Sequence, residues 1–438
     1  MSESLEAWIA REYRYAAQAM LRSVSAVDIV KTRPGFGQSI RAAKGSIIAS
    51  PVLAAYDPDP DYFFHWFRDS AVVIEALRLL HADGSLGDEA RQHFADFLSF
   101  GLSLQKLDGR ERVRDASWRE PVIDSFRQYL RDEDDLSAAR GDRIVAETRV
   151  NPDGTLDISK WARPQHDGPP LRALAVLRWL RNQRFDAAIE AQAAALLSAD
   201  LAFAFAHGGE PSYDIWEEEK GLHYYTLRVS AAALSEGADW LDTQADAERA
   251  AQYRQRAASL LQTLDGFWDE GQGYYRSRVL ESGAASSKEL DIAVILSAIH
   301  AEADQGLHSV QDPRQQSTLL RLEALFDALY PINQNRSLER GPAMGRYAGD
   351  VYYSGGAYYF STLGAAEFCY RAAAVAPDSQ HWRKRGDAYL ATVQAYTPDS
   401  GDLSEQFDQV TGAQTSARHL AWSYAAFISC VNLRRKSV

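Results

Sequence analysis

The chain has 438 residues, of which 46% are hydrophobic and 24% are charged, and its formal net charge is −13. This is the composition of an ordinary globular protein, long enough to bury a large core without disulfide support. The acidic balance, with no Lys/Arg run of the kind that binds phosphate backbones, argues against nucleic acid or an anionic membrane as partner and favours a neutral ligand.

The N-terminal stretch, MSESLEAWIAREYRYAAQ, is amphipathic and charged and has no apolar signal-peptide core. No apolar run is read as membrane-spanning. We therefore expect a cytoplasmic protein and a monomer, although a mature form without its leader would look the same. Cys369 and Cys430 lie in apolar segments. Buried free thiols are the simplest interpretation, with a bridge between them as the alternative.

In chain order, helical periodicity dominates and two kinds of helix alternate. The first kind is amphipathic, with one apolar face. The second kind is apolar nearly all round and must be buried on every side. The amphipathic helices are predicted at 4–24, 86–107, 184–206, 242–268, 313–329 and 378–396. The apolar helices are predicted at 70–82, 168–181, 222–239, 288–302, 355–374 and 417–433.

Six outer and six inner helices in strict alternation predict an all-α protein, an (α/α)6 barrel with antiparallel neighbours. No Pro/Gly/Ser-rich linker divides the chain, so 1–438 is interpreted as one domain with no further domain. In such a ring the loops that lead into the inner helices converge on one mouth. Those loops are DYFFHWFRDSA (61–71), WARPQHDGP (161–169), YDIWEEEKG (213–221), GDVYYSGGAYY (349–359) and SEQFDQVTGAQTSAR (404–418), whereas the loop before the helix at 288 is bland.

These loops combine tryptophans with carboxylates, which suits a sugar, because pyranose rings offer apolar faces and hydroxyls together. Glycosidic hydrolysis needs one protonated carboxyl group and one carboxylate. Glu217 follows Trp216 and has acidic neighbours, and both apolar packing and nearby negative charge favour its protonated form. The alternative is that the acidic run only complements a helix N-terminus.

Glu405, in LSEQFD, is the candidate base, and its alternative is an ordinary polar loop residue. Arg68 and Asp69, in FRDSA, are candidate ligands, or else a surface pair in which Asp69 caps a helix. The histidines show no metal-ligand spacing, and we expect neither metal nor cofactor. Two other classes are weighed: a terpene-type cyclase, suggested by DEDD at 132–135, and a non-catalytic sugar-binding barrel.

Five motifs taken together resemble the glucoamylases, glycoside hydrolase family 15. They are DYFFHWFRDSA, WARPQHDGP, YDIWEE, GRYAGDVYYSGG and EQFD…SARHLAWSYAA, and they occur in the family's order from about residue 45 to the end. The resemblance implies an (α/α)6 barrel and an inverting, exo-acting hydrolase that releases β-glucose from non-reducing ends of α-1,4-linked gluco-oligosaccharides. It implies an oligosaccharide substrate and no cofactor.

Carried over motif by motif, the resemblance makes Glu217 the general acid and Glu405 the general base. Glu218 becomes a sugar ligand, and we interpret Glu219 as a solvated helix-start charge. The implied contacts with the terminal glucose are Tyr62, Trp66, Arg68, Asp69, Glu218, Arg346 and Trp422, with the backbone carbonyls of Ile215 and Trp216. Those implied for the next subsite and the approach to the acid are Trp161, Tyr352 and Ser416.

The sequence departs from the family's fungal pattern on the leaving-sugar side. Where the fungal members have a tryptophan after Asn-Pro, this chain has Gly356, Ala357 and Tyr358. It also has His166 in place of a basic residue. RYAGD also lacks the usual proline and glutamate. These changes leave linkage and chain-length preference open, with an α-1,6-glucan or trehalose hydrolase as the alternative within the family.

Overall fold

A computed structural model describes residues 3–55, 59–334 and 336–437, and it contains all twelve helices that the periodicity predicts. The outer helices are α1 (Leu5–Leu21), α3 (Glu89–Leu104), α7 (Ala187–His207), α9 (Ala247–Asp265), α11 (Pro313–Leu329) and α14 (Ser379–Tyr396). The inner helices are α2 (Phe67–Ala82), α6 (Gly168–Asn182), α8 (Tyr224–Thr243), α10 (Ala293–His300), α13 (Tyr359–Val375) and α15 (Ala421–Lys436).

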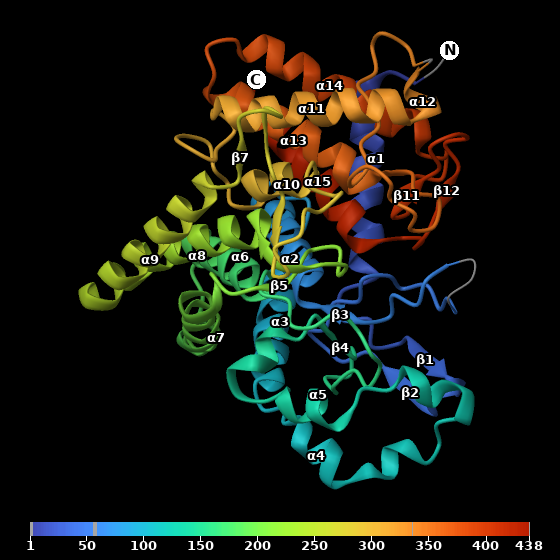
Figure 1. Cartoon of the computed structure of the whole chain (residues 1–438), viewed down its shortest axis with the longest axis vertical. Coiled ribbons are helices and arrows are strands. Elements are labelled where there is room, and N and C mark those ends of the chain that lie inside the picture. Colours follow the sequence, from blue (N-terminus) through green and yellow to red (C-terminus); the bar gives the residue numbers. More distant parts are fainter. Residues whose placement is uncertain (1–2, 56–58, 335, 438) are drawn as a thin grey trace.

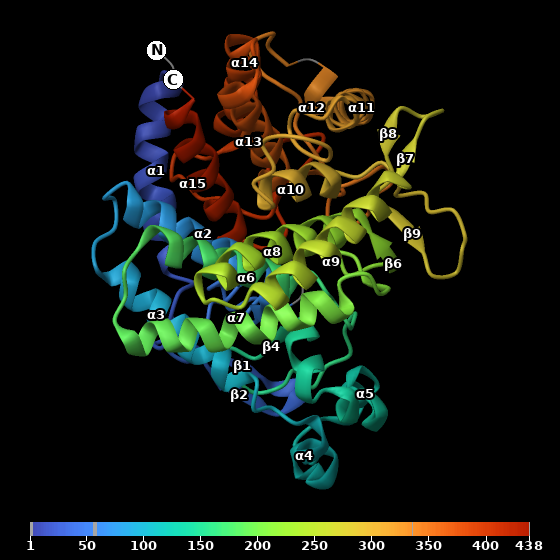
Figure 2. The same cartoon turned by 90° about the vertical axis from the view of Figure 1, so that its left-hand side faces the viewer.

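The inner helices form a closed ring. Each contacts the next in the order α2, α6, α8, α10, α13 and α15, and α15 returns to α2. The outer helices pack on this ring from outside (Figures 1 and 2), and α1 lies against α15, where Arg434 pairs with Glu6. The (α/α)6 barrel is therefore confirmed.

Burial follows the two predicted helix types. Every residue of α13 from Tyr359 to Ala373 is buried, as an inner helix requires. Helix α9 buries only one face, at three- and four-residue spacing, through Ala250, Tyr253, Ala257, Leu260 and Leu264. Both cysteines are buried and unbridged, which confirms the free-thiol interpretation.

Helix α7 corrects one reading of the sequence. Over the described residues it is the one helix long and apolar enough, by length and composition, to cross a membrane. Its many alanines made this apolar stretch easy to overlook in the sequence. In the structure α7 packs as an outer helix against α3, α6 and α8, so its length and apolar composition are weak evidence for a membrane span.

Three inner helices begin four or five residues later than predicted, at Ala293, Tyr359 and Ala421, because the preceding residues belong to the mouth loops. Short antiparallel strands stiffen these loops. They are β3 (His65–Trp66) with β4 (Arg149–Val150); β5 (Ser212–Tyr213), β6 (Lys220–His223) and β9 (Arg278–Leu280); and β10 (Ala357–Tyr358), β11 (Gln406–Phe407) and β12 (Gln414–Thr415).

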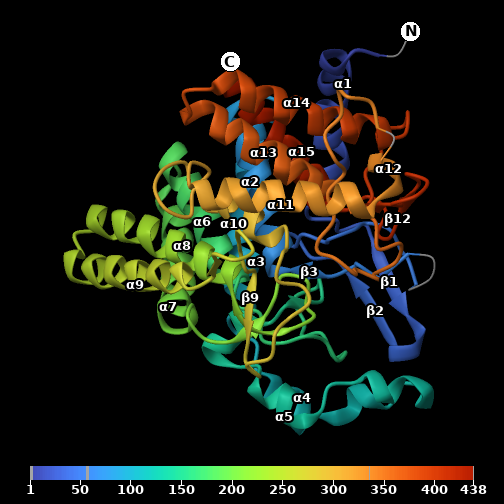
Figure 3. The ribbon, with the colours of Figure 1, turned by 45° about the horizontal axis from the view of Figure 1, so that its top comes forward.

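The remaining elements lie outside the two rings. The hairpin β1 (Val30–Arg33) and β2 (Gln38–Arg41) and the helices α4 (Gly109–Arg114) and α5 (Glu133–Ala138) extend from the side of the barrel that carries β3 and β4 (Figures 2 and 3). The DEDD segment lies at the start of α5, away from the barrel interior. Elsewhere are β7 (Trp268–Asp269) with β8 (Tyr274–Tyr275), α12 (Pro331–Gln334) and four 3-10 turns, Pro34–Phe36, Ala116–Arg119, Asp124–Tyr129 and Gly141–Ala146.

Candidate active site

Side-chain hydrogen bonds join the loops before the inner helices into one ring. The loop before α2 contacts the loop before α6 through Arg68 and Gln165, at 3.1 Å, and Gln165 donates to the backbone of Asp214 at 2.7 Å. Glu218 then contacts Lys288 and Arg346 in the next two loops. Tyr62 closes the ring, bonding to Tyr352 and Glu405. All six loops meet at one end of the barrel, as predicted.

The stretch YDIWEEEKG is the turn of a β-hairpin and not a helix start, because β5 and β6 flank it and α8 begins only at Tyr224. Buried Asp214 organises the turn by accepting hydrogen bonds from the backbone N–H groups of Glu218 and Glu219 at 2.7 and 3.0 Å. Glu217 has a φ of +66°, in the left-handed region. A non-glycine residue held there costs about 1–3 kcal/mol and marks functional sites.

Three donors hold the Glu217 carboxylate. Trp66 Nε1 donates to Oε1 at 2.8 Å, Arg68 Nη2 donates to the same oxygen at 3.3 Å, and Trp161 Nε1 donates to Oε2. The sequence argument had placed Trp216 against this carboxyl group. Instead, Trp216 Nε1 donates to Asp291 at 2.8 Å, and its ring stacks on Phe360.

Glu405 is buried and is held by hydroxyl groups. Ser416 donates to Oε2, and Tyr62 lies 3.2 and 3.3 Å from the two carboxylate oxygens. Burial raises the pKa of Glu405 to about 7, while the hydrogen bond from Ser416 and the charge of Arg346 oppose the rise. The carboxyl group can therefore exchange a proton near neutral pH.

The two carboxylates lie in one site without bonding to each other. Tyr62, which contacts Glu405, packs against the ring of Trp66 with centroids 5.2 Å apart, and Trp66 donates to Glu217. The contact between Tyr62 and Trp66 therefore connects the side chains that hold the two carboxylates. This arrangement suits chemistry in which each group acts on a different atom of the substrate.

Arg68 and Asp69 are buried and not a surface pair. Neither caps α2, which begins at Phe67, and Asp69 lies inside its first turn. Arg68 Nη2 is 3.3 Å from Asp69 and Nη1 is 3.7 Å from Asp167. Arg68 Nε has no hydrogen-bond partner within the protein, which leaves one donor for a ligand, whereas Asp69 Oδ2 is the oxygen of the ion pair with Arg68.

Glu218 belongs to a second charged group. Its carboxylate accepts from Arg346 at 3.1 Å, from Lys288 at 2.7 Å and from the Tyr347 hydroxyl. Arg346 is buried and also forms a bidentate pair with Asp350 at 2.6 and 2.7 Å. The structure thus brings Glu218 and Arg346 together.

Glu219 is not a solvated helix-start charge. It accepts hydrogen bonds from Arg278 at 2.9 Å and from Ser286 at 2.8 Å. Arg278 also pairs with buried Asp214 and Asp291. The loop before α10, which the sequence analysis treated as bland, therefore supports the hairpin that carries Glu217.

Trp422, Phe360 and Trp216 form an aromatic cluster. The rings of Trp422 and Phe360 are 4.3 Å apart and nearly parallel, and Trp216 stacks on Phe360 with the ring centroids 6.0 Å apart. Arg68 lies over Trp422 at 5.4 Å. Ile215 is buried beside these residues, in the turn of the hairpin.

Trp161 and Tyr352 lie on the outer side of the site. Trp161 is 41% exposed, and the guanidinium group of Arg149 lies 3.5 Å from the centroid of its ring. One face of the ring is therefore covered by a cation–π contact. Tyr352 bonds to Tyr62 at 2.8 Å. The sequence analysis missed Arg149 as well as Lys288, Arg278 and Asp291, because no motif singled out their loops.

In the part of the chain that the structure describes, no group of three His, Cys, Asp or Glu side chains could hold a metal ion. The mouth offers two carboxylates, buried arginines and the exposed ring of Trp161. Together with the barrel, these features define a glycoside hydrolase that uses paired carboxylates.

Comparison with known proteins identifies the family. The model of Glycosyl hydrolases family 15 matches residues 34–100, 146–384 and 375–432, so the chain belongs to this family. The "Probable glucoamylase" of Schizosaccharomyces pombe is 29% identical over 90% of this chain and 85% of its own length. "Glucoamylase 1" of Rhizopus oryzae is 25% identical over 98% of this chain and 71% of its own length.

Solved structures agree with these sequence matches. The structure of Hormoconis resinae glucoamylase superimposes with a TM-score of 0.76 and 26% identity, covering 99% of this chain and 74% of that one. The glucoamylase from Saccharomycopsis fibuligera, at 21% identity and a TM-score of 0.77, supports the fold and covers 99% and 96%. The protein is a glycoside hydrolase of the glucoamylase type.

Proposed function

We propose that this protein hydrolyses α-1,4-linked gluco-oligosaccharides from their non-reducing ends and releases β-D-glucose with inversion. The observation that supports this most directly is that one mouth holds two carboxylates that have different partners and do not pair with each other. Glu217 is held by Trp66, Arg68 and Trp161, and Glu405 is held by Ser416 and Tyr62. Inverting enzymes keep their carboxyl groups about 6.5–9.5 Å apart, which leaves room for a water molecule.

In the proposed step, Glu217 gives its proton to the glycosidic oxygen as the bond to the anomeric carbon breaks. A water molecule attacks that carbon from the opposite face and loses a proton to Glu405. The products are glucose with inverted configuration and a shortened oligosaccharide. Glu217 ends ionised and Glu405 protonated, and proton exchange with solvent restores both.

The terminal glucose would lie among Arg68, Asp69, Glu218 and Arg346. The unpartnered Nε of Arg68 offers a donor to a sugar hydroxyl, and the Asp69 carboxylate, which is ion-paired with Arg68, offers an acceptor. The buried stack of Trp422 on Phe360 below them would block a longer chain from threading through the barrel, which favours exo action. The exposed ring of Trp161 is a platform for the next sugar.

The test is to incubate the protein with maltose, maltoheptaose, isomaltose and trehalose, and to follow glucose and its anomers by NMR. We expect the α-1,4 substrates to react fastest and β-glucose to appear first. Initial release of α-glucose would overturn the inverting mechanism. Faster hydrolysis of isomaltose or trehalose would overturn the linkage. The cytoplasmic location and the monomeric state stay predictions, to be checked by fractionation and by light scattering.

A further inference from the structure

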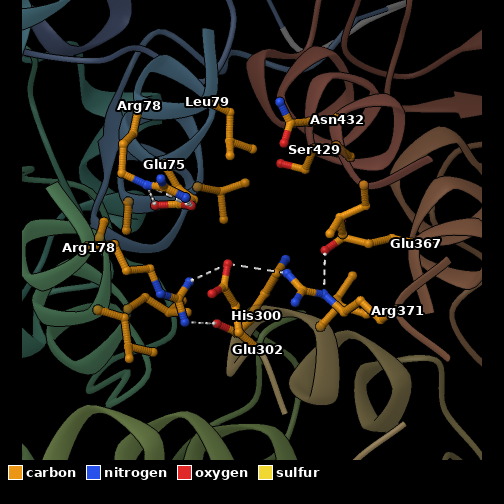
Figure 4. A pocket seen from close by; sticks show the side chains of 18 of the residues that line it. Glu75, Arg78, Leu79, Arg178, His300, Glu302, Glu367, Arg371, Ser429 and Asn432 are labelled. Carbon is orange, nitrogen blue, oxygen red and sulfur yellow. Dashed lines mark hydrogen bonds and ion pairs between the residues drawn. The ribbon is translucent and has the colours of Figure 1, made fainter. Parts of the chain in front are cut away.

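A second cavity lies at the opposite end of the barrel from the carboxylates. Its volume is about 400 Å³, within the range of about 300–1,000 Å³ for small-molecule sites. The walls come from the inner helices α2, α6, α10, α13 and α15 and from the segment that follows α10 (Figure 4). Exposed Arg181 and Lys436 lie among its lining residues.

Charged side chains of both signs surround this cavity in pairs (Figure 4). Arg78 pairs with Glu75. Glu302 lies between Arg178 and Arg371, at 3.6 and 3.3 Å, and Arg371 also pairs with Glu367 at 3.1 Å. With Arg181, Lys436 and Asp304, which also line the cavity, five cationic and four acidic side chains surround it, so neither sign of charge dominates the wall.

Two neighbouring arginines keep Glu302 charged at neutral pH. Although burial alone would raise it, the charges of Arg178 and Arg371 lower the pKa of Glu302 to about 2. Burying paired charges is costly compared with an apolar wall, and stability alone is weak grounds for such a network. A wall rich in paired donors and acceptors instead suits a neutral ligand covered with hydroxyl groups, which both donate and accept.

Two buried polar atoms in this wall have no partner within the protein. Arg178 Nε is a donor and Asn432 Oδ1 is an acceptor, and both residues are at least 95% buried. Ser429, which lies next to Asn432 in Figure 4, adds a hydroxyl group on the same side. Apolar side chains such as Leu174 and Leu433 line the same space and could pack against the C–H face of a pyranose ring.

The cavity reaches the layer below the catalytic carboxylates. Trp422 and Phe360, whose rings stack at 4.3 Å, line it, and so does His300. Arg68, which contacts Glu217, lies over Trp422 on the side of the mouth. One aromatic layer therefore separates the two ends of the barrel.

We propose that this cavity is a second binding site for a neutral monosaccharide or similar polyol, distinct from the catalytic mouth. The ligand enters between the ends of α6 and α15 and bonds to Arg178, Asn432 and the paired carboxylates. The site does not depend on the proposed hydrolytic function, because none of these residues belongs to the catalytic group.

The experiment compares Ser429→Phe, which fills the cavity, with the matched control Ser429→Ala, which leaves it open. The thermal unfolding midpoint of each purified variant is measured with increasing glucose, since a ligand that binds only the folded state raises it. Glucose that binds at the mouth raises the midpoint of both variants equally, so its contribution cancels when the two rises are compared. We expect the glucose-induced rise in Ser429→Phe to be less than half of that in Ser429→Ala and in the wild type.

Equal rises in the two variants would overturn the proposal and leave a water-filled cavity. A larger difference with gluconate or inorganic phosphate than with glucose would overturn the neutral class of ligand. Leu433→Trp and Leu433→Ala form a second pair at the rim, should Ser429→Phe fail to fold. The difference within each pair is measurable even if the protein hydrolyses no glucan, so this proposal and the proposed function fail separately.

Discussion

The two candidate catalytic carboxylates contrast in how the protein holds them. Glu217 lies in a hairpin turn with left-handed backbone and receives hydrogen bonds from two indole N–H groups and a guanidinium group. Glu405 is buried beside β11 and is held by the hydroxyl groups of Ser416 and Tyr62. One carboxylate is positioned by aromatic rings and a cation, the other by hydroxyls.

This difference matches the proposed division of labour. The indole groups that hold Glu217 belong to Trp66 and Trp161, and the ring of Trp161 is also a candidate platform for the leaving sugar, so acid and leaving group are positioned by the same side chain. The hydroxyls near Glu405 can rotate to donate or accept, which suits a group that must receive a proton from water. Variants at each site should therefore fail in different ways.

Glu405→Gln should have the largest effect. We expect kcat to fall about 10²–10⁴-fold on every substrate, because water activation is needed whatever the leaving group. The measurement is kcat on maltose and on α-glucosyl fluoride. The control is Glu210→Gln, which changes a surface glutamate. Unchanged kcat in the folded variant would remove Glu405 from the mechanism.

Glu217→Gln should lower kcat on maltose to a similar extent but should spare α-glucosyl fluoride. Fluoride departs with little protonation, whereas a sugar hydroxyl needs the acid. The ratio of the two kcat values in this variant, set against the same ratio in Glu405→Gln, is the measurement. If both variants lose the two substrates equally, the contrast between acid and base is wrong.

Trp161→Ala should lower kcat/KM on maltose and maltoheptaose by about tenfold, through loss of a sugar platform and of a donor to Glu217. Trp161→Phe keeps an aromatic face and removes only the N–H group, so it separates the two contributions. We expect KM to change mainly in the alanine variant. Unchanged kinetics in both variants would make Trp161 a packing residue.

The pH dependence of kcat/KM should reflect the ionisation of the Glu405 carboxyl group. A base must be ionised, and burial raises the pKa of Glu405 to about 7, so activity should fall as the pH decreases through about 7. The hydrogen bond from Ser416 lowers that pKa, so Ser416→Ala should raise it and move the acid-side limb to higher pH, by about one unit. Ser423→Ala, which leaves Glu405 untouched, should not move the limb.

The sequence predicted the helices and the convergence of their loops well, because burial leaves a periodic pattern that can be read residue by residue. The apolar circumference of α13 and the single buried face of α9 are examples. Helix starts were less accurate at α10, α13 and α15, since their preceding loops form strands only through pairing with distant segments.

The candidate site was predicted where a motif carried it and missed where it depended on distant partners. Glu217, Glu405 and Arg346 stood in recognisable stretches. Arg278, Asp291 and Lys288 did not, because their role comes from contacts with residues about 60 or more positions away or across a turn. The hairpin around Glu217 was mistaken for a helix start for the same reason: its strand pairing to β9 is not visible locally.

Glu219→Gln should have the smallest effect and tests that correction. A solvated charge could be replaced without consequence, whereas here Glu219 accepts from Arg278 and Ser286, and its side chain is 24% exposed. The amide keeps one acceptor oxygen, and Arg278 retains Asp214 and Asp291, so the loss should be about 1 kcal/mol or less. In a chain of this size that lowers the unfolding midpoint by no more than about 2–4 °C.

We expect kcat on maltose to change less than about threefold, since Glu219 holds the hairpin and does not contact the carboxylate of Glu217. Thermal unfolding and maltose kinetics of Glu219→Gln, beside Glu281→Gln as the exposed control, decide the matter. A fully stable variant would show that Glu219 is a solvated charge, as the sequence analysis had it. A stable but inactive variant would make Glu219, and not Glu217, the general acid.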